Sequence, residues 1–326
     1  MTAESEIIAR LRRMATASAA RGLRDDVAVL DGLAITHDSI AEGVHFLPGD
    51  PPASVGWKLV AVNLSDLAAK GATPAGALLS MTLSGDGSWE SEFLTGVEHA
   101  CESYALPLIG GDTIALPQGA PRVLGMTAIG RAQAHVPDRA GARLGDALWL
   151  VGTLGDAAAG LEQLRANPHA TGPLVDIYRR PVPQLGAGQI IAPHAHATMD
   201  ISDGLLLDSL RMAEASGCCI EIALDLPPLS SMFLAERGSD REAHLFAATG
   251  GDDYALLAAL SADLDPARLS LPQGTRITRI GIVAAGEPSL SLTWRGEAVQ
   301  LPERLGFEHK SDESRGLSAA PMGDRP

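Results

Sequence analysis

Residues 57–74 read WKLVAVNLSDLAAKGATP, and this stretch indicates the fold class. The apolar run before Asp66 predicts a buried strand, after which Leu64-Ser65-Asp66 opens a helix that stops at Gly71. A carboxylate that follows such a strand points into the crevice where α/β proteins bind their ligands. The stretch therefore predicts an α/β protein with Asp66 at a binding site.

The second half of the chain repeats this arrangement. Residues 201–203 (ISD) open a predicted helix that stops at Gly217, and a Gly-Gly-Asp motif follows in each half, ending at Asp112 and at Asp252. The Asp-to-Asp separations are 46 residues in the first half and 49 in the second. Two short motifs in the same order at similar spacing predict an internal duplication, with two related α/β domains.

Other segments support an α/β (α+β) fold with mixed sheets. The predicted strands are 33–36, 77–83, 123–129 and 147–151, and the clearest predicted helices are 89–104 and 205–216. Proline, glycine and charged residues gather at 135–145, which places a domain boundary between 1–138 and 139–309. Residues 310–326 have no hydrophobic period and are expected to form a disordered tail.

Composition excludes several classes of protein. The chain has 326 residues and a net charge of −15 without a basic run, which argues against a nucleic-acid partner. It contains no apolar run of about 18 residues, so we expect no membrane span. Its three cysteines, Cys101, Cys218 and Cys219, form no CxxC pair and suit a reducing cytoplasm.

Aspartates recur beside apolar runs and small residues along the whole chain. They are Asp25, Asp26, Asp38, Asp66, Asp112, Asp200, Asp203, Asp252 and Asp253. Each could simply cap a helix or a turn, but capping does not require repeated apolar runs that lead into aspartate. The repetition therefore favours one shared site.

Carboxylates that converge without lysine or arginine partners repel one another unless a cation lies among them. No His/Cys pattern suggests zinc, and an all-oxygen set suits Mg²⁺, which completes its shell with water and substrate phosphates. The backbone amides of Gly110 and Gly111 could also contact phosphates. The expected ligand is a nucleoside triphosphate.

The motifs of the common nucleotide enzymes are missing. The sequence contains no GxxxxGK[ST], HRD, DFG or GxGxxG motif, and no GxSxG or HExxH. The expected chemistry is metal-assisted phosphoryl transfer, which depends mainly on positioning and on charge neutralisation. No residue stands out as a covalent nucleophile or a general base.

Seven motifs in order resemble those of the thiamine-monophosphate kinases. They are DDVAVL, THDSIAEGVHF, WKLVAVNLSDLAAKGATP, LIGGDT, GRA, MDISDGLLLD and GGDDYAL. That family belongs to the superfamily of aminoimidazole ribonucleotide synthetase and selenophosphate synthetase, and the resemblance runs from about residue 6 to residue 309. It implies a homodimer of two-domain subunits that binds ATP and several Mg²⁺ ions and passes the γ-phosphoryl group directly to thiamine monophosphate. The N-terminal domain would bind ATP and Mg²⁺ and form the dimer, and the C-terminal domain would complete the site.

The resemblance also implies roles for individual residues. The metal ligands would be Asp26, Thr36, His37, Asp38, Asp66, Asp112, Asp200 and Asp203. Tyr104, Gly111, Asp112, Arg131 and Ser202 would bind ATP. His45, Asp252 and Phe307 would bind the substrate, with the Phe307 ring on the thiamine ring.

Three positions depart from the family pattern. Arg24 replaces a glycine beside a metal ligand, His37 replaces a threonine, and Asp252 replaces a glutamate. Imidazole is a poor ligand for Mg²⁺, so a metal contact at His37 would use its backbone. None of the three changes removes a carboxylate.

Two other readings stay open. Another ATP-dependent synthetase of the superfamily would keep the fold, although a selenophosphate synthetase normally has a reactive cysteine near its N-terminus, and the first cysteine here is Cys101. A nucleotide-binding protein without catalysis is disfavoured, because it has little need for so many clustered carboxylates.

Overall fold

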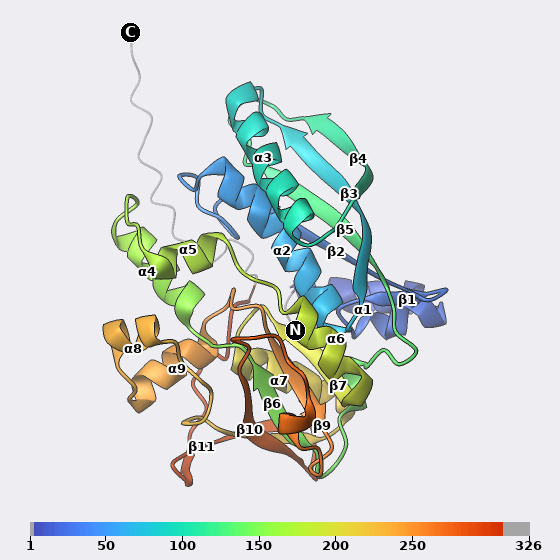
Figure 1. Ribbon diagram of the computed structural model, residues 1–326, viewed down its shortest axis with the longest axis vertical. Helices are drawn as coiled ribbons and strands as arrows, with labels where there is room; N and C mark the ends of the chain where they lie inside the picture. The colour runs from blue at the N-terminus through green and yellow to red at the C-terminus, as the bar shows by residue number, and fades with distance from the viewer. Residues whose placement is uncertain (1–2, 309–326) are drawn as a thin grey trace.

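The computed structural model describes residues 3–308, which form two β-sheets with helices packed on them (Figure 1). The predicted tail at 310–326 lies outside the described residues. The first sheet contains β1 (Ala28–Leu30), β2 (Leu33–Ala41), β3 (Thr73–Leu83), β4 (Leu108–Ala115) and β5 (Val123–Arg131). Its helices are α1 (Ala3–Met14), α2 (Pro52–Ala69), α3 (Gly87–Ser103) and the short 3-10 helix η1 (Ser18–Leu23). The strand order is β1-β2-β5-β3-β4, and only β3 and β4 pair in parallel.

The second sheet has seven strands in the order β12-β11-β8-β10-β6-β9-β7. They are β6 (Ala147–Val151), β7 (Ala195–Ile201), β8 (Cys219–Ala223), β9 (Ala255–Leu260), β10 (Ile277–Ala284), β11 (Ser289–Trp294) and β12 (Glu297–Val299). The helices are α4 (Asp156–Ala166), α5 (Pro173–Arg179), α6 (Leu185–Ile191), α7 (Leu205–Ser216), α8 (Ser231–Arg237) and α9 (Arg241–Thr249), with 3-10 helices η2 (Arg139–Gly141), η3 (Ala192–His194) and η4 (Pro266–Arg268). The predicted α/β class with mixed sheets is confirmed.

Helix α2 lies between the two sheets. It contacts β2 and β5 of the first sheet and β7 and β9 of the second, and its flanks pack on α3 and α6. Every residue from Val55 to Ala69 except Trp57 is buried. The core around α2 therefore joins both halves of the chain. Although α2 is strongly apolar, no helix in the described part of the chain is both long and apolar enough to cross a membrane.

The predicted strand before Asp66 is wrong. Residues 52–69 form one continuous helix that starts at a proline and ends just before Gly71, whose φ of +62° suits glycine. A helix that is buried on nearly all sides lacks the polar face that produces a period of 3.6 residues. Its apolar run therefore resembles a buried strand in the sequence.

The repeated motifs do not occupy equivalent places. Asp66 lies in the last turn of α2, whereas Asp203 precedes the first turn of α7. Asp112 lies within β4, whereas Asp252 lies in the loop between α9 and β9. The two motif pairs therefore lie at different positions in their domains, although their spacing in the sequence is similar. The segment 132–146 connects the two sheets, and the boundary at 138/139 stays a prediction.

Close packing of α2 depends on glycines in its neighbours. A Cβ atom at Gly96 of α3 would lie 1.9 Å from the carbonyl oxygen of Ala53, and one at Gly188 of α6 would lie 1.9 Å from that of Ala68. Both contacts are with backbone atoms, so no side chain can move aside. The two glycines let the neighbouring helices approach the α2 backbone directly.

We therefore expect Gly96→Ala to lower the free energy of unfolding by about 1–3 kcal/mol, the usual cost of forcing extra atoms into a packed core. Thermal unfolding followed by circular dichroism measures this change. Gly87→Ala is the matched control, because Gly87 lies in the first turn of the same helix with no atom within 4 Å of the added Cβ. A Gly96→Ala protein as stable as the control would contradict the packing argument.

Candidate active site

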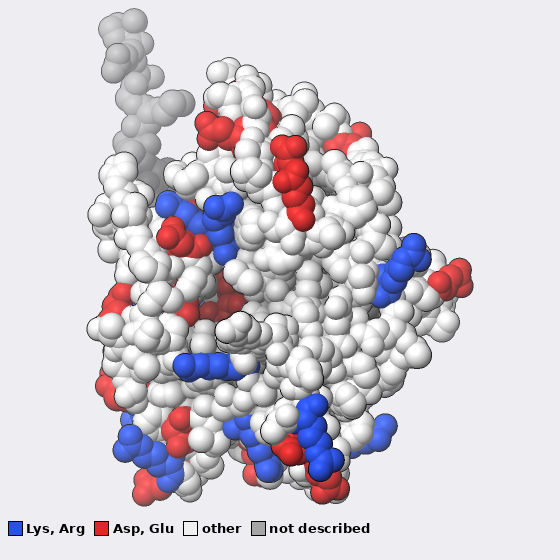
Figure 2. All heavy atoms as spheres, in the orientation of Figure 1, with Lys and Arg blue, Asp and Glu red and all other residues white. Residues whose placement is uncertain are grey.

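Three carboxylates from distant segments meet where α2 ends between the sheets. Asp26 precedes β1, Asp66 lies in the last turn of α2, and Asp200 lies in β7. One oxygen of each lies within 4.8 Å of the others. Figure 2 shows acidic atoms recessed in a hollow of the surface, with basic side chains above and below it in this view.

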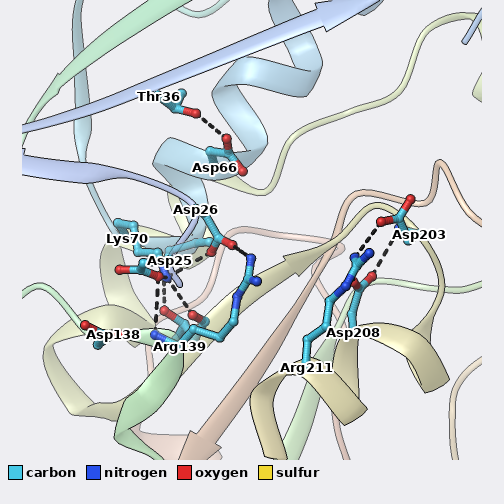
Figure 3. Close-up of polar contacts among 12 residues, drawn as sticks. Asp25, Asp26, Thr36, Asp66, Lys70, Asp138, Arg139, Asp203, Asp208 and Arg211 are labelled. Carbon is cyan, nitrogen blue, oxygen red and sulfur yellow. Dashed lines mark hydrogen bonds and ion pairs between the residues drawn. The ribbon is translucent and has the colours of Figure 1, made fainter. Parts of the chain in front are cut away.

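Strand β2 faces this cluster with Thr36 and Asp38. Alternate residues of a strand share a face, and Thr36 is buried on the side that packs against α2. The Thr36 hydroxyl donates a hydrogen bond to Asp66 Oδ2 (Figure 3). The backbone amide of Asp38 donates to Oδ1 of Asn63 on α2, at 3.0 Å. These contacts fix the register of β2 against the helix.

The carboxylates at the centre of the site carry little compensating charge. Burial raises the pKa of Asp66 well above its ordinary value, and the charges of Asp38, Asp200 and Asp26 raise it further. Burial and the charge of Asp26 likewise raise the pKa of Asp200. Burial raises the pKa of Asp38 to about 6, although His37 opposes this shift. A cation between them would relieve both the repulsion and the burial cost.

The donor set fits Mg²⁺. It consists of carboxylate oxygens with the Thr36 hydroxyl beside them, and hard cations prefer oxygen ligands. Asp26, Asp66 and Asp200 would hold the ion, while Asp38 borders the same space.

Sequence reasoning missed the cations on one side of this site. Lys70 Nζ lies 2.5 Å from Asp25 Oδ1 and 2.9 Å from Asp26 Oδ2, and Arg139 pairs with the other oxygen of Asp26 (Figure 3). Although burial raises the pKa of Asp26, Arg139 and Lys70 lower it below its ordinary value. The expectation that the aspartates lack basic partners is therefore wrong for Asp25 and Asp26. Neither partner stands out in the sequence, because each is a single basic residue without a motif.

A second group of charges lies at the start of α7. Arg211 contacts Asp203 at 2.5 Å and Asp208 at 2.8 Å (Figure 3). Asp208 also accepts hydrogen bonds from the backbone amides of Asp203 and Gly204. Asp203 thus has a basic partner too, yet it lies close enough to raise the pKa of Asp38.

Asp112 and Gly111 lie on the edge strand of the first sheet, away from the three-carboxylate cluster. Asp112 stands opposite the exposed Ser80 of β3, in a row of residues whose side chains face away from α2. His37 points to that outer face as well, where its Nδ1 lies 2.8 Å from the hydroxyl of Thr127. The structure therefore does not bring Asp112 or the imidazole of His37 to the cluster.

The other predicted nucleotide residues also lie in different places. Arg131 is exposed at the end of β5, and the arginine that reaches the carboxylates is Arg139. Tyr104 follows α3 and packs against Trp57 of α2, with ring centroids 5.7 Å apart. Ser202 lies in the loop after β7, beside the cluster, where its carbonyl oxygen accepts the backbone amide of Asp252 at 2.8 Å.

The three predicted substrate residues lie around this same loop. The backbone amide of Phe307 donates to the Asp203 carbonyl oxygen at 2.9 Å. Lys58 joins the other two, since its Nζ lies 3.0 Å from the His45 carbonyl oxygen and 2.9 Å from Asp252 Oδ2. His45 Nδ1 accepts the amide of Ala41 at 3.0 Å.

Comparison with known proteins identifies similar chains. The family models for the AIR synthase related protein match residues 24–132 with the N-terminal domain and residues 143–292 with the C-terminal domain. The thiamine-monophosphate kinase of Caulobacter vibrioides is 35% identical over 94% of this chain and 90% of its own. The thiamine-monophosphate kinase of Escherichia coli is 35% identical over 88% of this chain and 91% of its own.

A solved structure, AaThiL complexed with AMPPCP and TMP, has a TM-score of 0.78 and 32% sequence identity. The match covers 93% of this chain and 96% of AaThiL. Both relatives and this structure therefore align with both sheets.

We expect Asp66→Asn to separate a metal site from a purely structural carboxylate. A raised pKa means that ionisation of Asp66 costs stability as the pH rises above the ordinary Asp value, so the amide should raise the Tm at pH 7 without metal. For the unmodified protein, Mg²⁺ at about 100 times its Kd should add about 2.7 kcal/mol. Asp66→Asn should lose most of that gain.

Thermal unfolding with and without Mg²⁺ measures both effects. Asp240→Asn serves as control, because Asp240 caps α9 away from the cluster and asparagine caps equally well. An Asp66→Asn protein that gains as much from Mg²⁺ as the unmodified chain would remove Asp66 from the metal site.

Proposed function

The chain belongs to the thiamine-monophosphate kinase family of AIR synthase related proteins, and on that premise we propose that it phosphorylates thiamine monophosphate with ATP. The products are thiamine diphosphate and ADP. The observation that carries this proposal is the cluster of Asp26, Asp66 and Asp200 at the junction of the two sheets. The likeness to AaThiL complexed with AMPPCP and TMP supports it.

The reaction depends on magnesium held by this cluster. Bound Mg²⁺ supplies positive charge that offsets the repulsion between the two phosphate-bearing substrates. Lys70 and Arg139 pair with Asp26 on one side, and a cation beside Asp66 and Asp200 would favour the charged forms of these two carboxylates. The guanidinium of Arg139 lies beside these carboxylates and can contact a nucleotide phosphate.

Phosphoryl transfer is direct and in line. An oxygen of the thiamine monophosphate phosphate attacks the γ-phosphorus, and the bond from that phosphorus to the bridging oxygen of ADP breaks. The attacking oxygen already belongs to an anion, so the step needs neither a general base nor a covalent intermediate. Asp38, the one candidate nucleophile, borders the carboxylate cluster, and a carboxylate engaged by a cation is a poor nucleophile.

A second copy of the chain completes the nucleotide site. Strand β4 lies at the edge of its sheet with every residue exposed, including Leu108, Ile109 and Ile114. An exposed apolar edge of this kind favours pairing with another chain. Pairing there would place Gly111 and Asp112 at an interface between protomers.

The remaining assignments follow from this function. Domains 1–138 and 139–309 each contribute to the site, and the enzyme works in the cytoplasm. Tyr104 and Ser202 bind the nucleotide, and Asp203 adds a metal ligand. His45, Asp252 and Phe307 bind the thiamine part of the substrate.

We expect the purified chain to form thiamine diphosphate from ATP and thiamine monophosphate, and to need Mg²⁺. Chromatography of the products with and without a chelator measures this. If the protein binds ATP but forms no product from thiamine monophosphate or from a synthetase substrate, the result would favour a nucleotide-binding protein without catalysis.

ATP made chiral at its γ-phosphorus with thiophosphate and oxygen isotopes should give thiamine diphosphate with inverted configuration. A single in-line displacement inverts that phosphorus, and two displacements retain it. Retention, or labelled protein trapped from ATP alone, would contradict direct transfer and return Asp38 to consideration as the nucleophile.

We expect His45→Ala to raise the KM for thiamine monophosphate about 10-fold, the effect of one lost hydrogen bond to a charged group. The KM for ATP should change less than two-fold, because no hydrogen bond to ATP is removed. Steady-state kinetics with each substrate varied in turn give both values. His99→Ala, at an exposed position of α3, is the control. Equal increases for the two substrates would oppose a substrate-side role.

A further inference from the structure

Lys58 is a buried lysine within α2 to which neither the sequence nor the proposed function gives a role. It is 2% exposed and lies about two turns before Asp66 on the same helix. Its ammonium group contacts the His45 carbonyl oxygen at 3.0 Å and Asp252 Oδ2 at 2.9 Å. It also lies 4.0 Å from the centre of the Tyr178 ring, a cation–π contact.

These contacts come from both halves of the chain. His45 follows β2 of the first half, whereas Asp252 precedes β9 and Tyr178 lies in α5 of the second. An ammonium group has three N–H donors. Two of them reach oxygen atoms and the third can face the ring, so Lys58 is fully occupied by the protein. It therefore acts on other residues and not on a ligand.

Asp252 is held from two sides. Lys58 contacts its Oδ2, and the Tyr254 hydroxyl donates to its Oδ1 at 2.9 Å. Each carboxylate oxygen has two lone pairs, so each can accept one more hydrogen bond. The Asp252 side chain is 25% exposed, which leaves it open on one side.

The backbone around Asp252 is also constrained. Asp252 and Tyr254 have φ values of +69° and +49°, a left-handed conformation that side-chain-bearing residues adopt at a cost. Asp253 between them is partly buried and accepts the backbone amide of Gly155 at 2.9 and 3.0 Å. The amides of Asp252 and Tyr254 donate to the carbonyl oxygens of Ser202 and Ile201. Such a loop persists only when its surroundings determine it.

From these contacts we infer that Lys58 and Tyr254 are positioning residues for recognition of the thiamine part of the substrate. They hold the Asp252 carboxylate and the His45 segment together across the junction, so that one carboxylate face points to the substrate. Thiamine offers that face an amino group on its pyrimidine and a positively charged thiazolium, and both suit a carboxylate. This inference rests on the proposed function, and it adds two residues that do not touch the reacting phosphates.

Lys58→Met is the direct test, since methionine keeps an unbranched apolar chain against Tyr178 and removes the charge together with its N–H donors. We expect the KM for thiamine monophosphate to rise about 10-fold or more, as when a partner of a charged group is removed. The kcat and the KM for ATP should stay within about two-fold. Tyr254→Phe removes a single hydroxyl and should raise the same KM about three-fold.

A double variant tests whether the effect passes through Asp252. The fold-increases in KM caused by Lys58→Met and by Asp252→Asn should not multiply when the two substitutions are combined, because both break the same contact. Arg237→Met is the matched control: Arg237 also combines an ion pair, with Glu162, and a ring contact, 3.7 Å from the centre of Phe246. It should leave every kinetic constant unchanged.

Three outcomes would overturn the inference. The first is an unchanged KM for thiamine monophosphate in both single variants, and the second is an equal rise in the KM values for thiamine monophosphate and ATP. The third is a double variant whose increase in KM equals the product of the two single increases. If Lys58→Met does not fold, Tyr254→Phe decides by the same criteria. Failure of the proposed function is distinguishable, because the unmodified protein would then not phosphorylate thiamine monophosphate at all.

Discussion

The buried ammonium group of Lys70 is the interaction on which the arrangement of the site depends. An unpaired charge in a protein interior is very costly, so its three donors need partners. They reach Asp25, Asp26 and the carbonyl oxygen of Thr198. Burial lowers the pKa of Lys70, but the charges of Asp26 and Asp25 more than reverse this shift. One side chain thereby joins the segment before β1, the end of α2 and strand β7.

Helix α2 turns this local constraint into the geometry of the whole junction. Lys58 lies about two turns into the helix, Lys70 directly follows its last residue, and Asp66 lies between them. Each lysine binds an oxygen atom from the second half of the chain, and the apolar residues of the helix pack on both sheets. The two lysines therefore contact different parts of the candidate site. Lys70 contacts Asp26 of the proposed metal site, and Lys58 contacts His45 and Asp252, the proposed substrate residues.

The sequence allowed the fold class and most of the carboxylates to be predicted, because short apolar runs beside aspartate are local patterns. Asp26, Asp66 and Asp200 do meet, as expected of a shared site. The basic partners could not be predicted, since Arg139 is separated from Asp26 by 113 residues and Lys58 from Asp252 by 194. Pairing at such distances depends on how the two sheets pack, which no local pattern encodes.

The direction of a side chain could not be predicted from the sequence where a buried helix resembles a strand. Asp66 lies on the fully buried helix α2, whose sequence resembles a strand. Asp112 lies on a true strand, but strand alternation turns it to the face opposite α2. Two aspartates with similar sequence contexts thus lie on opposite sides of the same sheet. Only the three-dimensional packing distinguishes them.

The carboxylates of the site divide into two groups by their partners, and this division accounts for its chemistry. Asp26 is neutralised by Lys70 and Arg139, which lower its pKa, so its charge is retained without any metal. In the described part of the chain Asp66 and Asp200 have no basic partner, and their pKa values are raised, so a cation beside them would offset charge that the protein leaves uncompensated. The charge of Asp26 nevertheless repels Asp66 and Asp200 and helps to raise their pKa values, and a cation between the three would relieve this repulsion. A site of this kind is held in shape by its lysine and arginine before a cation arrives, and it still has charge left for the cation to neutralise.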